Sequence, residues 1–490
     1  MSQAMSRLAT GAALVTAAAL VIATGIASAD TNDTNPSPSA SSSPSSTSSP
    51  SSTATPLPTI SPSPSFTGPA NGTSVDCPVT TAELTASQAA TAFQLAAQKL
   101  ASAARGSKRR YPFGALANQT AYMRTGPSAW TSGFFPAELW SMYQATNDDR
   151  WLRRARDYSA ALIPVANDKG THDLGFMIGV PMTLATALEP SAKRKRAYLN
   201  AEITAAKSLA RRYNDRVHAI KSATYGGKWG VIIDSSMNAP MLIEVGQWLG
   251  PEGDLLIYEG TQHMLTLARD FIRPNGSTFH RMAFDPRTGA LIGPIAGQGL
   301  ASTSSTWSRG QAWAINGFAR SYALTANPEL LKAAEATANY WMSRVPPGCV
   351  PAWDLDVSNS RAPRDSSAAA IAASGMLALV DIEPSSDAAT TYRTYARLTL
   401  GTLASPGWLN TRSSNPGILL QQSLNVPADP HDGSYVWGDY YLLDAITAAL
   451  RTLPTPLPTP SVSPSGSSTS TPSATPGTTP DPTPKPSPTD

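Results

Sequence analysis

The sequence predicts an all-α protein, an (α/α)6 barrel of six helical hairpins with a small β-hairpin, flanked by disordered tails rich in Ser, Thr and Pro. Three observations predict it. Apolar residues recur at helical spacing through almost all of residues 77–452. The helices alternate between a more charged and a less charged kind. An internal repeat shows that one unit is a helix, a short turn and a second helix.

The tails are defined by composition. Of the 43 prolines, 21 lie in residues 30–76 and 453–490, among serines and threonines. These segments carry too few apolar side chains to offset the entropy of ordering, so we expect extended spacers. The domain between them spans residues 77–452. The formal net charge of +3, without clustered basic runs, argues against a dedicated nucleic-acid binder.

The N-terminus, residues 1–29, has the pattern of an export signal. Arg7 precedes the apolar run Leu8–Ile26, and Ala27-Ser28-Ala29 supplies small residues for cleavage. The alternative is a membrane anchor, since the run is long enough to span a bilayer. Its alanines and threonines make it weakly hydrophobic, which favours cleavage. We therefore expect a secreted, extracellular protein with no membrane attachment after cleavage.

The predicted helices fall into two sets that alternate along the chain. The more charged, outer set is Ala86–Ala104, Leu152–Pro164, Arg196–Arg212, Leu255–Ile272, Glu329–Arg344 and Ala388–Leu403. The less charged, inner set is Gly133–Ala145, Leu174–Leu188, Ser235–Trp248, Arg309–Leu324, Ser366–Val380 and Tyr440–Leu450. A helix with few charged residues is covered on more sides, which places the second set inside.

The repeat supports a closed ring. Two segments align, with Trp130, Gly133, Tyr143 and Thr146 matching Trp307, Gly310, Tyr322 and Thr325. A unit of this size cannot bury its apolar face alone, so neighbouring units must stack. An open solenoid would need polar caps at both ends, whereas pairing of the first and last helices would close the ring. One stretch departs from the pattern, because Thr278–Phe284 and Ala290–Ile292 flank a turn typical of a β-hairpin.

The starts of the inner helices carry the candidate chemistry. In an alternating ring these helices run the same way, so Asp173, Asp234, Arg309, Asp365 and Asp439 should meet at one mouth. Each Asp could instead be a helix cap, which we favour for the last two because of their Ser and Gly neighbours. Asp234 follows an apolar run that would bury it and raise its pKa, as a proton donor needs.

Tryptophans accompany these carboxylates. Trp130, Trp307 and Trp313 could lie in the core or could form a platform on which sugar rings stack. The planar fork of Arg309 suits a carboxylate or sulfate. A pair of carboxylates beside such a platform suggests sugar chemistry, without deciding which reaction.

These motifs resemble those of the unsaturated glucuronyl hydrolases, glycoside hydrolase family 88. The matching runs cover nearly all of the domain in the family's order: Gly133–Trp140, His172–Phe176, Ile233–Asn238, Gln298-Gly299, Trp307–Trp313, Arg364–Ala370 and Gly438–Tyr440. The resemblance implies an (α/α)6 barrel that removes a 4,5-unsaturated uronic acid from the non-reducing end of oligosaccharides made by polysaccharide lyases. It implies hydration of the vinyl ether double bond rather than displacement at the anomeric carbon.

The resemblance also implies residue roles. Asp234 is the general acid that protonates C4 and then the base that activates water for attack at C5, and Asp173 is the second essential carboxylate. The implied substrate-binding residues are Trp130, His172, Asn238, His280, Gln298, Trp307, Arg309 and Trp313, with the tryptophans stacking on sugar rings. We expect no cofactor and no metal, since this hydration needs none and the histidines are scattered. The expected partner is an unsaturated uronyl oligosaccharide, from glycosaminoglycan or microbial polysaccharide, bound by a monomer.

Other interpretations remain open. An unsaturated galacturonyl hydrolase is the nearest one, although the run His172–Phe176 favours the glucuronyl type. A polysaccharide lyase on the same ring would use Tyr440 or His280 as a base, but nothing around them marks that role. A binding module without activity would not need both carboxylates. In an exported chain Cys77 and Cys349 could form a disulfide, or they could be free buried thiols.

Overall fold

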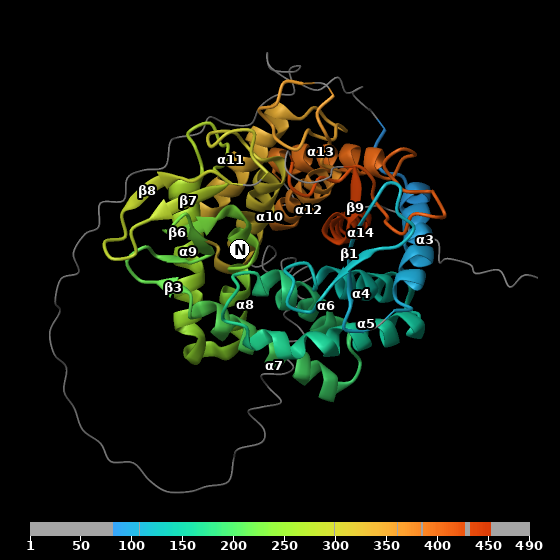
Figure 1. Cartoon of the computed structure of the whole chain (residues 1–490), viewed down its shortest axis with the longest axis horizontal. Coiled ribbons are helices and arrows are strands. Elements are labelled where there is room, and N and C mark those ends of the chain that lie inside the picture. The colour runs from blue at the N-terminus through green and yellow to red at the C-terminus, as the bar shows by residue number, and fades with distance from the viewer. Residues whose placement is uncertain are drawn as a thin grey trace, which may run out of the picture. The chain divides into compact units, whose positions relative to one another are not determined.

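The computed structural model describes residues 82–451, except 107, 298, 360, 384–385 and 427–431, and these belong to one compact unit. Within it, outer helices alternate with inner helices around a ring (Figure 1). The outer helices are α3 (Ala86–Ala103), α5 (Asp149–Leu162), α7 (Ala192–Ala210), α9 (Asp254–Phe271), α11 (Pro328–Arg344) and α13 (Asp387–Leu403). The inner helices are α4 (Phe134–Thr146), α6 (Val180–Leu188), α8 (Pro240–Leu249), α10 (Ser308–Thr325), α12 (Ser366–Ile382) and α14 (Val436–Leu450).

The ring is closed. Helix α14 packs against α4, so the last inner helix meets the first, as predicted. The inner helices are covered on all sides: in α12 every residue from Ser366 to Leu377 is buried. The outer helices are amphipathic, and α5 buries Trp151, Leu152 and Ala155 while Arg150 stays exposed. Because an inner helix cannot solvate a charged side chain, the charge difference in the sequence identified the two layers correctly.

The internal repeat has a geometric basis. Helices α4 and α10 both end on a left-handed residue, Asn147 with φ 51° and Ala326 with φ 52°. In both, the preceding threonine hydroxyl donates to the carbonyl four residues back and accepts the backbone N–H two residues ahead. The repeated threonine therefore fixes the same turn between inner and outer helix in both units.

Two inner helices begin irregularly, where the sequence predicted continuous α-helix. A π-helix, η2 (Gly175–Gly179), precedes α6, and a 3-10 helix, η3 (Ile233–Met237), precedes α8. A methyl group on Gly175 would lie 2.5 Å from the Cα of Asn238, so η2 and η3 are packed with their backbones in contact. Such departures from regular helix are frequent at functional sites.

The predicted hairpin exists, as β7 (Arg281–Phe284) and β8 (Leu291–Pro294), but it is half of a larger sheet. That sheet has the antiparallel order β5-β6-β7-β8, with β5 (Ala223–Tyr225) and β6 (Lys228–Ile232). The other sheets are β2 (Met123–Thr125), β1 (Tyr111–Leu116) and β9 (Gly433–Tyr435), and the pair β3 (Tyr213–Asn214) and β4 (Ala219–Ile220). The prediction of a single small hairpin therefore missed most of the strands. Strands of two to six residues are too short to show a clear alternation of apolar and polar side chains in the sequence.

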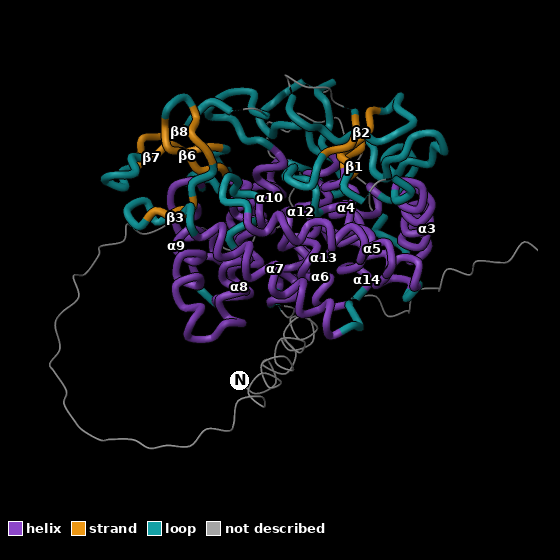
Figure 2. Tube along the Cα trace, turned by 60° about the horizontal axis from the view of Figure 1, so that its bottom comes forward, coloured by secondary structure: helices purple, strands orange, loops and turns teal. Residues whose placement is uncertain are grey.

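Strands and loops gather at one end of the helical ring (Figure 2). Within residues 82–451 as described, none of the helices is long and apolar enough to span a bilayer. The predicted export signal (1–29), linker (30–76) and tail (453–490) lie outside the described residues, as does Cys77. Cys349 is buried, and none of the described cysteines is free.

Candidate active site

Asp234 lies at the first turn of η3, directly after strand β6. The N–H of Ile233 donates to the carbonyl of His280 at 2.9 Å, which joins this turn to the segment leading into β7. The side chain of Asp234 is 16% exposed, and its Oδ2 lies 3.9 Å from Nε2 of His280. Among the described residues this buried oxygen accepts no hydrogen bond. The Oδ2 atom of Asp234 is thus shielded from water and has no described hydrogen-bond donor within bonding distance.

Burial is the main cause that raises the pKa of Asp234 to about 7, and the charge of Asp173 adds to the shift. The positive charges of Arg309 and Arg281 act in the opposite direction. A carboxyl group with this pKa is partly protonated at neutral pH and can donate a proton, then take one back.

Asp173 precedes η2, and its side chain is 19% exposed. Its Oδ2 accepts from the hydroxyl of Thr171 at 3.2 Å, and its Oδ1 lies 3.6 Å from Nδ1 of His172. Burial lowers the pKa of His172, so this imidazole is neutral at pH 7 and leaves the charge of Asp173 uncompensated. That charge adds to the effect of burial in raising the pKa of Asp234.

Asn238 connects the two carboxylate segments. Its Oδ1 accepts from the N–H of Phe176 in η2 at 2.9 Å, and its Nδ2 donates to the carbonyl of Asp234 at 3.2 Å. The side chain is completely buried, with 1% of the residue exposed. Asn238 was predicted to bind substrate. That role stays a prediction, and in the structure its two bonds connect η2 to the turn that carries Asp234.

The aromatic residues divide between the site and the core. Trp307 packs against His280, with 4.4 Å between ring centroids and 40° between the ring planes, and half-buried Trp130 packs against Trp437 at 5.0 Å. Trp313 has no exposed surface and packs against Phe176 in the middle of the ring. The stacking role predicted for Trp313 is therefore wrong for this structure, because no face of the indole is open to a sugar.

Arg309 lies near Asp234 but is already engaged. Its Nη1 donates to Asp365 Oδ2 at 2.6 Å, its Nη2 donates to the carbonyl of Leu424 at 2.7 Å, and its guanidinium lies over the Trp307 ring at 4.6 Å. Asp365 also caps α12, as predicted, by accepting from the N–H of Ala368. Binding of a substrate carboxylate by Arg309 stays a prediction.

Arg281 and Tyr225 are site residues that the sequence reasoning missed. The guanidinium of Arg281 lies 4.5 Å from the centre of the Tyr225 ring and influences both Asp234 and His172 electrostatically. Within the described part of the chain, Arg281 forms no ion pair with a carboxylate. Its position directly after His280, within the predicted strand Thr278–Phe284, was the signal available in the sequence.

Asp439 and Glu138 are the other carboxyl groups buried under the mouth. Asp439 accepts from the N–H groups of Ile418 and Leu419 at 3.0 and 2.8 Å and from the amide of Gln422 at 3.0 Å. It thus holds the loop before α14 rather than its own helix. Glu138 on α4 has no hydrogen-bond partner among the described residues, and burial raises its pKa well above the usual range, so it is a neutral acid. Glu138 was not predicted as a site residue, because it lies within an apolar run of an inner helix and not at the start of that helix.

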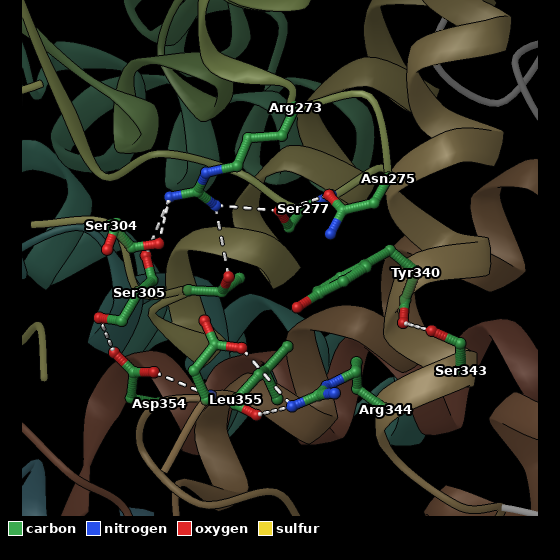
Figure 3. A network of polar contacts seen from close by, with 12 residues as sticks. Arg273, Asn275, Ser277, Ser304, Ser305, Tyr340, Ser343, Arg344, Asp354 and Leu355 are labelled. Carbon is green, nitrogen blue, oxygen red and sulfur yellow. Dashed lines mark hydrogen bonds and ion pairs between the residues drawn. The ribbon is translucent and has the colours of Figure 1, made fainter. Parts of the chain in front are cut away.

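A polar network outside the site fixes two segments that reach into it (Figure 3). Arg273 donates to the carbonyl of Thr278 at 2.9 Å and to that of Ser304 at 2.8 Å. Ser305 in turn donates to Asp354 at 2.6 Å. Since Thr278 and Ser305 lie just before His280 and Trp307, the network sets where those two rings meet.

Gln298, predicted to bind the uronate, lies outside the described residues. Among the residues the structure describes, His, Cys, Asp and Glu side chains form no group of three or more that could hold a metal ion. The site as described therefore offers acid–base groups, cations and aromatic faces around Asp234.

Comparison with known proteins gave consistent results. No family model matches the chain. It is 36% identical over 327 residues to an unsaturated glucuronyl hydrolase of Formosa agariphila, covering 65% of this chain and 79% of that protein. It is 30% identical over 338 residues to an unsaturated glucuronyl hydrolase of Bacillus sp. strain GL1, covering 66% and 87%. A crystal structure of an unsaturated glucuronyl hydrolase specific for heparin superposes with a TM-score of 0.69 at 28% identity, covering 75% of this chain and 98% of that one.

Proposed function

Since the chain belongs to the family of unsaturated glucuronyl hydrolases, we propose that it removes a 4,5-unsaturated glucuronic acid from the non-reducing end of oligosaccharides produced by lyases. The single observation that carries this proposal is Asp234: a shielded carboxyl group with a pKa of about 7, beside the second carboxylate Asp173. A vinyl ether is hydrated through protonation of carbon, which requires a positioned acid of this kind.

In the proposed reaction, Asp234 gives its proton to C4 of the unsaturated ring, and the cation formed is shared between C5 and the ring oxygen. The same carboxylate, now charged, takes a proton from a water molecule whose oxygen bonds to C5. The product is a hemiketal, which opens and releases the remaining sugar. Asp173 has the proposed role of holding the sugar hydroxyls and keeping the pKa of Asp234 high through its charge.

Positive charge is needed to bind the uronate carboxylate. The two terminal nitrogens of Arg309 already donate hydrogen bonds to Asp365 and to backbone carbonyls, whereas Arg281 has no ion pair among the described residues. We therefore assign the carboxylate first to Arg281 and keep Arg309 as the residue that orients Trp307. His280, between Asp234 and Trp307, has the proposed role of contacting the ring. We also propose that the protein is exported through residues 1–29 and meets lyase products outside the cell.

The experiment uses the ultraviolet absorbance of unsaturated disaccharides, which disappears when the double bond is hydrated. The wild-type protein should remove this absorbance from at least one member of a panel of chondroitin, hyaluronan and heparin-type unsaturated disaccharides. Asp234→Asn should abolish the reaction and Asp439→Asn, which alters a buried carboxyl group away from the acid, should retain measurable turnover. Creation of absorbance from intact polymer would indicate a lyase instead, and activity retained in Asp234→Asn would overturn the assignment of the acid.

A further inference from the structure

A pocket with a volume of about 320 Å³ lies among cationic and aromatic side chains. We call it the rim pocket, and its lining includes Lys169, Arg211, Arg212, Tyr213, Lys221 and Trp229. These residues come from the turn after α7, from β3 and β6, from the link between β4 and β5, and from the loop ahead of η2, at the end of the ring where strands and loops gather (Figure 2). The loop that carries Lys169 continues to Asp173, and the strand that carries Trp229 continues to Asp234. The segments that line the rim pocket thus lead directly to the two carboxylates, and the charge of Asp173 acts on Arg212 in the pocket lining.

The described side chains that line the pocket include four cations and no carboxylate. Lys169, Arg211 and Lys221 form no ion pair with any carboxylate in the described part of the chain. Lys169 and Arg211 are exposed and Lys221 is half-buried, so all three are accessible to a ligand. Cations that face one concavity without counter-ions attract anions and raise their local concentration.

Arg212 builds the pocket rather than neutralising it. Its guanidinium donates to the carbonyls of Lys169, Lys221 and Ser222 at 2.8, 2.9 and 2.8 Å. These three bonds fix the two lysine backbones on opposite sides of one planar group, and the charge of Arg212 is kept. Asp168 and Asp173 influence Arg212 only from beyond ion-pair distance. The geometry is thus set before a ligand arrives, which reduces the entropy cost of binding.

Two aromatic rings complete the lining. Tyr213 and Trp229 are half-buried, and the Trp229 ring is held edge-on against Phe284, with 6.2 Å between centroids. A pocket that combines fixed aromatic faces with free cations suits an acidic sugar, whose ring can contact the aromatic surface while its anionic group meets the cations.

We propose that the rim pocket is an anion subsite, which binds a sulfate or carboxylate group of an acidic oligosaccharide whose unsaturated end occupies the site of Asp234. The first part of this proposal, that the pocket binds an acidic sugar, is argued from the lining of the pocket alone. The second part, that the unsaturated end of the same sugar lies at Asp234, rests on the proposed function. The subsite makes the enzyme favour charged oligosaccharides longer than the disaccharide.

Binding is measured first, without catalysis. The probes are a sulfated tetrasaccharide and a tetrasaccharide with carboxylates only, both saturated so that neither can react, titrated calorimetrically at low salt. The test variant is the double substitution Lys221→Ala with Arg211→Ala, and the matched control is Lys228→Ala with Arg216→Ala, two exposed cations that do not line the pocket. We expect the affinity to fall about 10-fold in the test variant and by less than about 2-fold in the control. Whichever probe binds more tightly to the wild type identifies the anion.

Kinetics provides the second measurement, on unsaturated di- and tetrasaccharides. The test variant should raise KM for the acidic tetrasaccharide about 10-fold and leave KM and kcat for the disaccharide unchanged. The inference is overturned if the wild type binds neither saturated probe, if the control loses as much affinity as the test variant, or if both substrates are affected equally. A wild-type protein that binds the probes but hydrates no unsaturated sugar would instead overturn the proposed function and leave the subsite standing.

Discussion

The carboxylates at the mouth of the ring form two contrasting pairs. Asp365 and Asp439, at the starts of α12 and α14, are buried and satisfied: one pairs with Arg309 and caps its helix, and the other accepts three bonds from the loop before α14. Asp173 and Asp234, at the starts of the neighbouring inner segments, form no ion pair with Lys or Arg among the described residues. The second oxygen of Asp234 accepts no hydrogen bond there.

The difference shows how one fold position serves two purposes. Where a helix begins regularly, the carboxylate is engaged by an Arg and its own helix, as in Asp365, or by N–H groups of a neighbouring loop, as in Asp439, and it then holds the structure. Where η2 and η3 replace the start of the helix, neither Asp173 nor Asp234 pairs with a Lys or Arg among the described residues, and Oδ2 of Asp234 accepts no hydrogen bond. A buried carboxyl group without partners destabilises the fold when it is charged, and that is the property a proton donor needs.

The largest expected effect is on catalysis. Asp234→Asn should lower kcat by about 10²–10⁴-fold, since the carboxamide can neither give nor take the proton. Hydration of an unsaturated disaccharide, followed by loss of absorbance, measures it. An unchanged kcat would mean that Asp234 is not the proton donor and that the two carboxylate pairs do not differ in function.

Substitution of the structural carboxylates, Asp365 and Asp439, should lower the stability of the fold. Asp365→Ala leaves the buried charge of Arg309 without its carboxylate, and breaking such a pair typically costs about 3–5 kcal/mol. Chemical denaturation at pH 7 measures this free energy of unfolding. Arg309 keeps its bonds to the carbonyls of Ser423 and Leu424, so we expect the lower end of that range. A loss below about 1 kcal/mol would contradict a structural role for Asp365.

Substitution of Asp234 should have the opposite effect on stability, since it should stabilise the fold above neutral pH. Its pKa is higher in the fold, about 7, than the usual value of 3.8, so its ionisation costs stability progressively as pH rises from about 4 to 7. Asp234→Asn should therefore raise the melting temperature by about 2–4 °C at pH 8 and change it little at pH 4. Thermal unfolding of both proteins at the two pH values tests this. A destabilised variant at pH 8 would mean that the carboxylate is satisfied after all.

The smallest effect concerns pH. For the wild type, kcat/KM should fall as pH rises through about 7, because the proton donor is lost. Asp173→Asn removes the charge that raises the pKa of Asp234, so the residual activity should fall off at a lower pH, by about one unit. A pH–rate profile of both proteins measures the shift. A control is Asp168→Asn, a carboxylate on the same loop that is not among the groups acting on Asp234.

The sequence by itself determined the ring and the end of it at which the candidate site lies. Helical periodicity and the difference in charge between layers are local properties, and they located all twelve described ring helices. The starts of α6 and α8 were the largest errors, at Val180 rather than Leu174 and at Pro240 rather than Ser235, because η2 and η3 precede them. They also brought the inner helix starts to one mouth, and the apolar run before Asp234 correctly predicted its burial and raised pKa.

Only the tertiary structure decided which residues are free to act. Arg309 finds its partners at Asp365 and Ser423, which are 56 and 114 residues away, and Trp313 is buried by other helices. Arg281, Glu138 and the rim pocket likewise depend on segments distant in sequence. The physical reason is that a hydrogen bond or a buried face is assigned by whichever group lies nearest in space. Local pattern determines which residues reach the mouth, and packing between distant elements determines which of them remain available there.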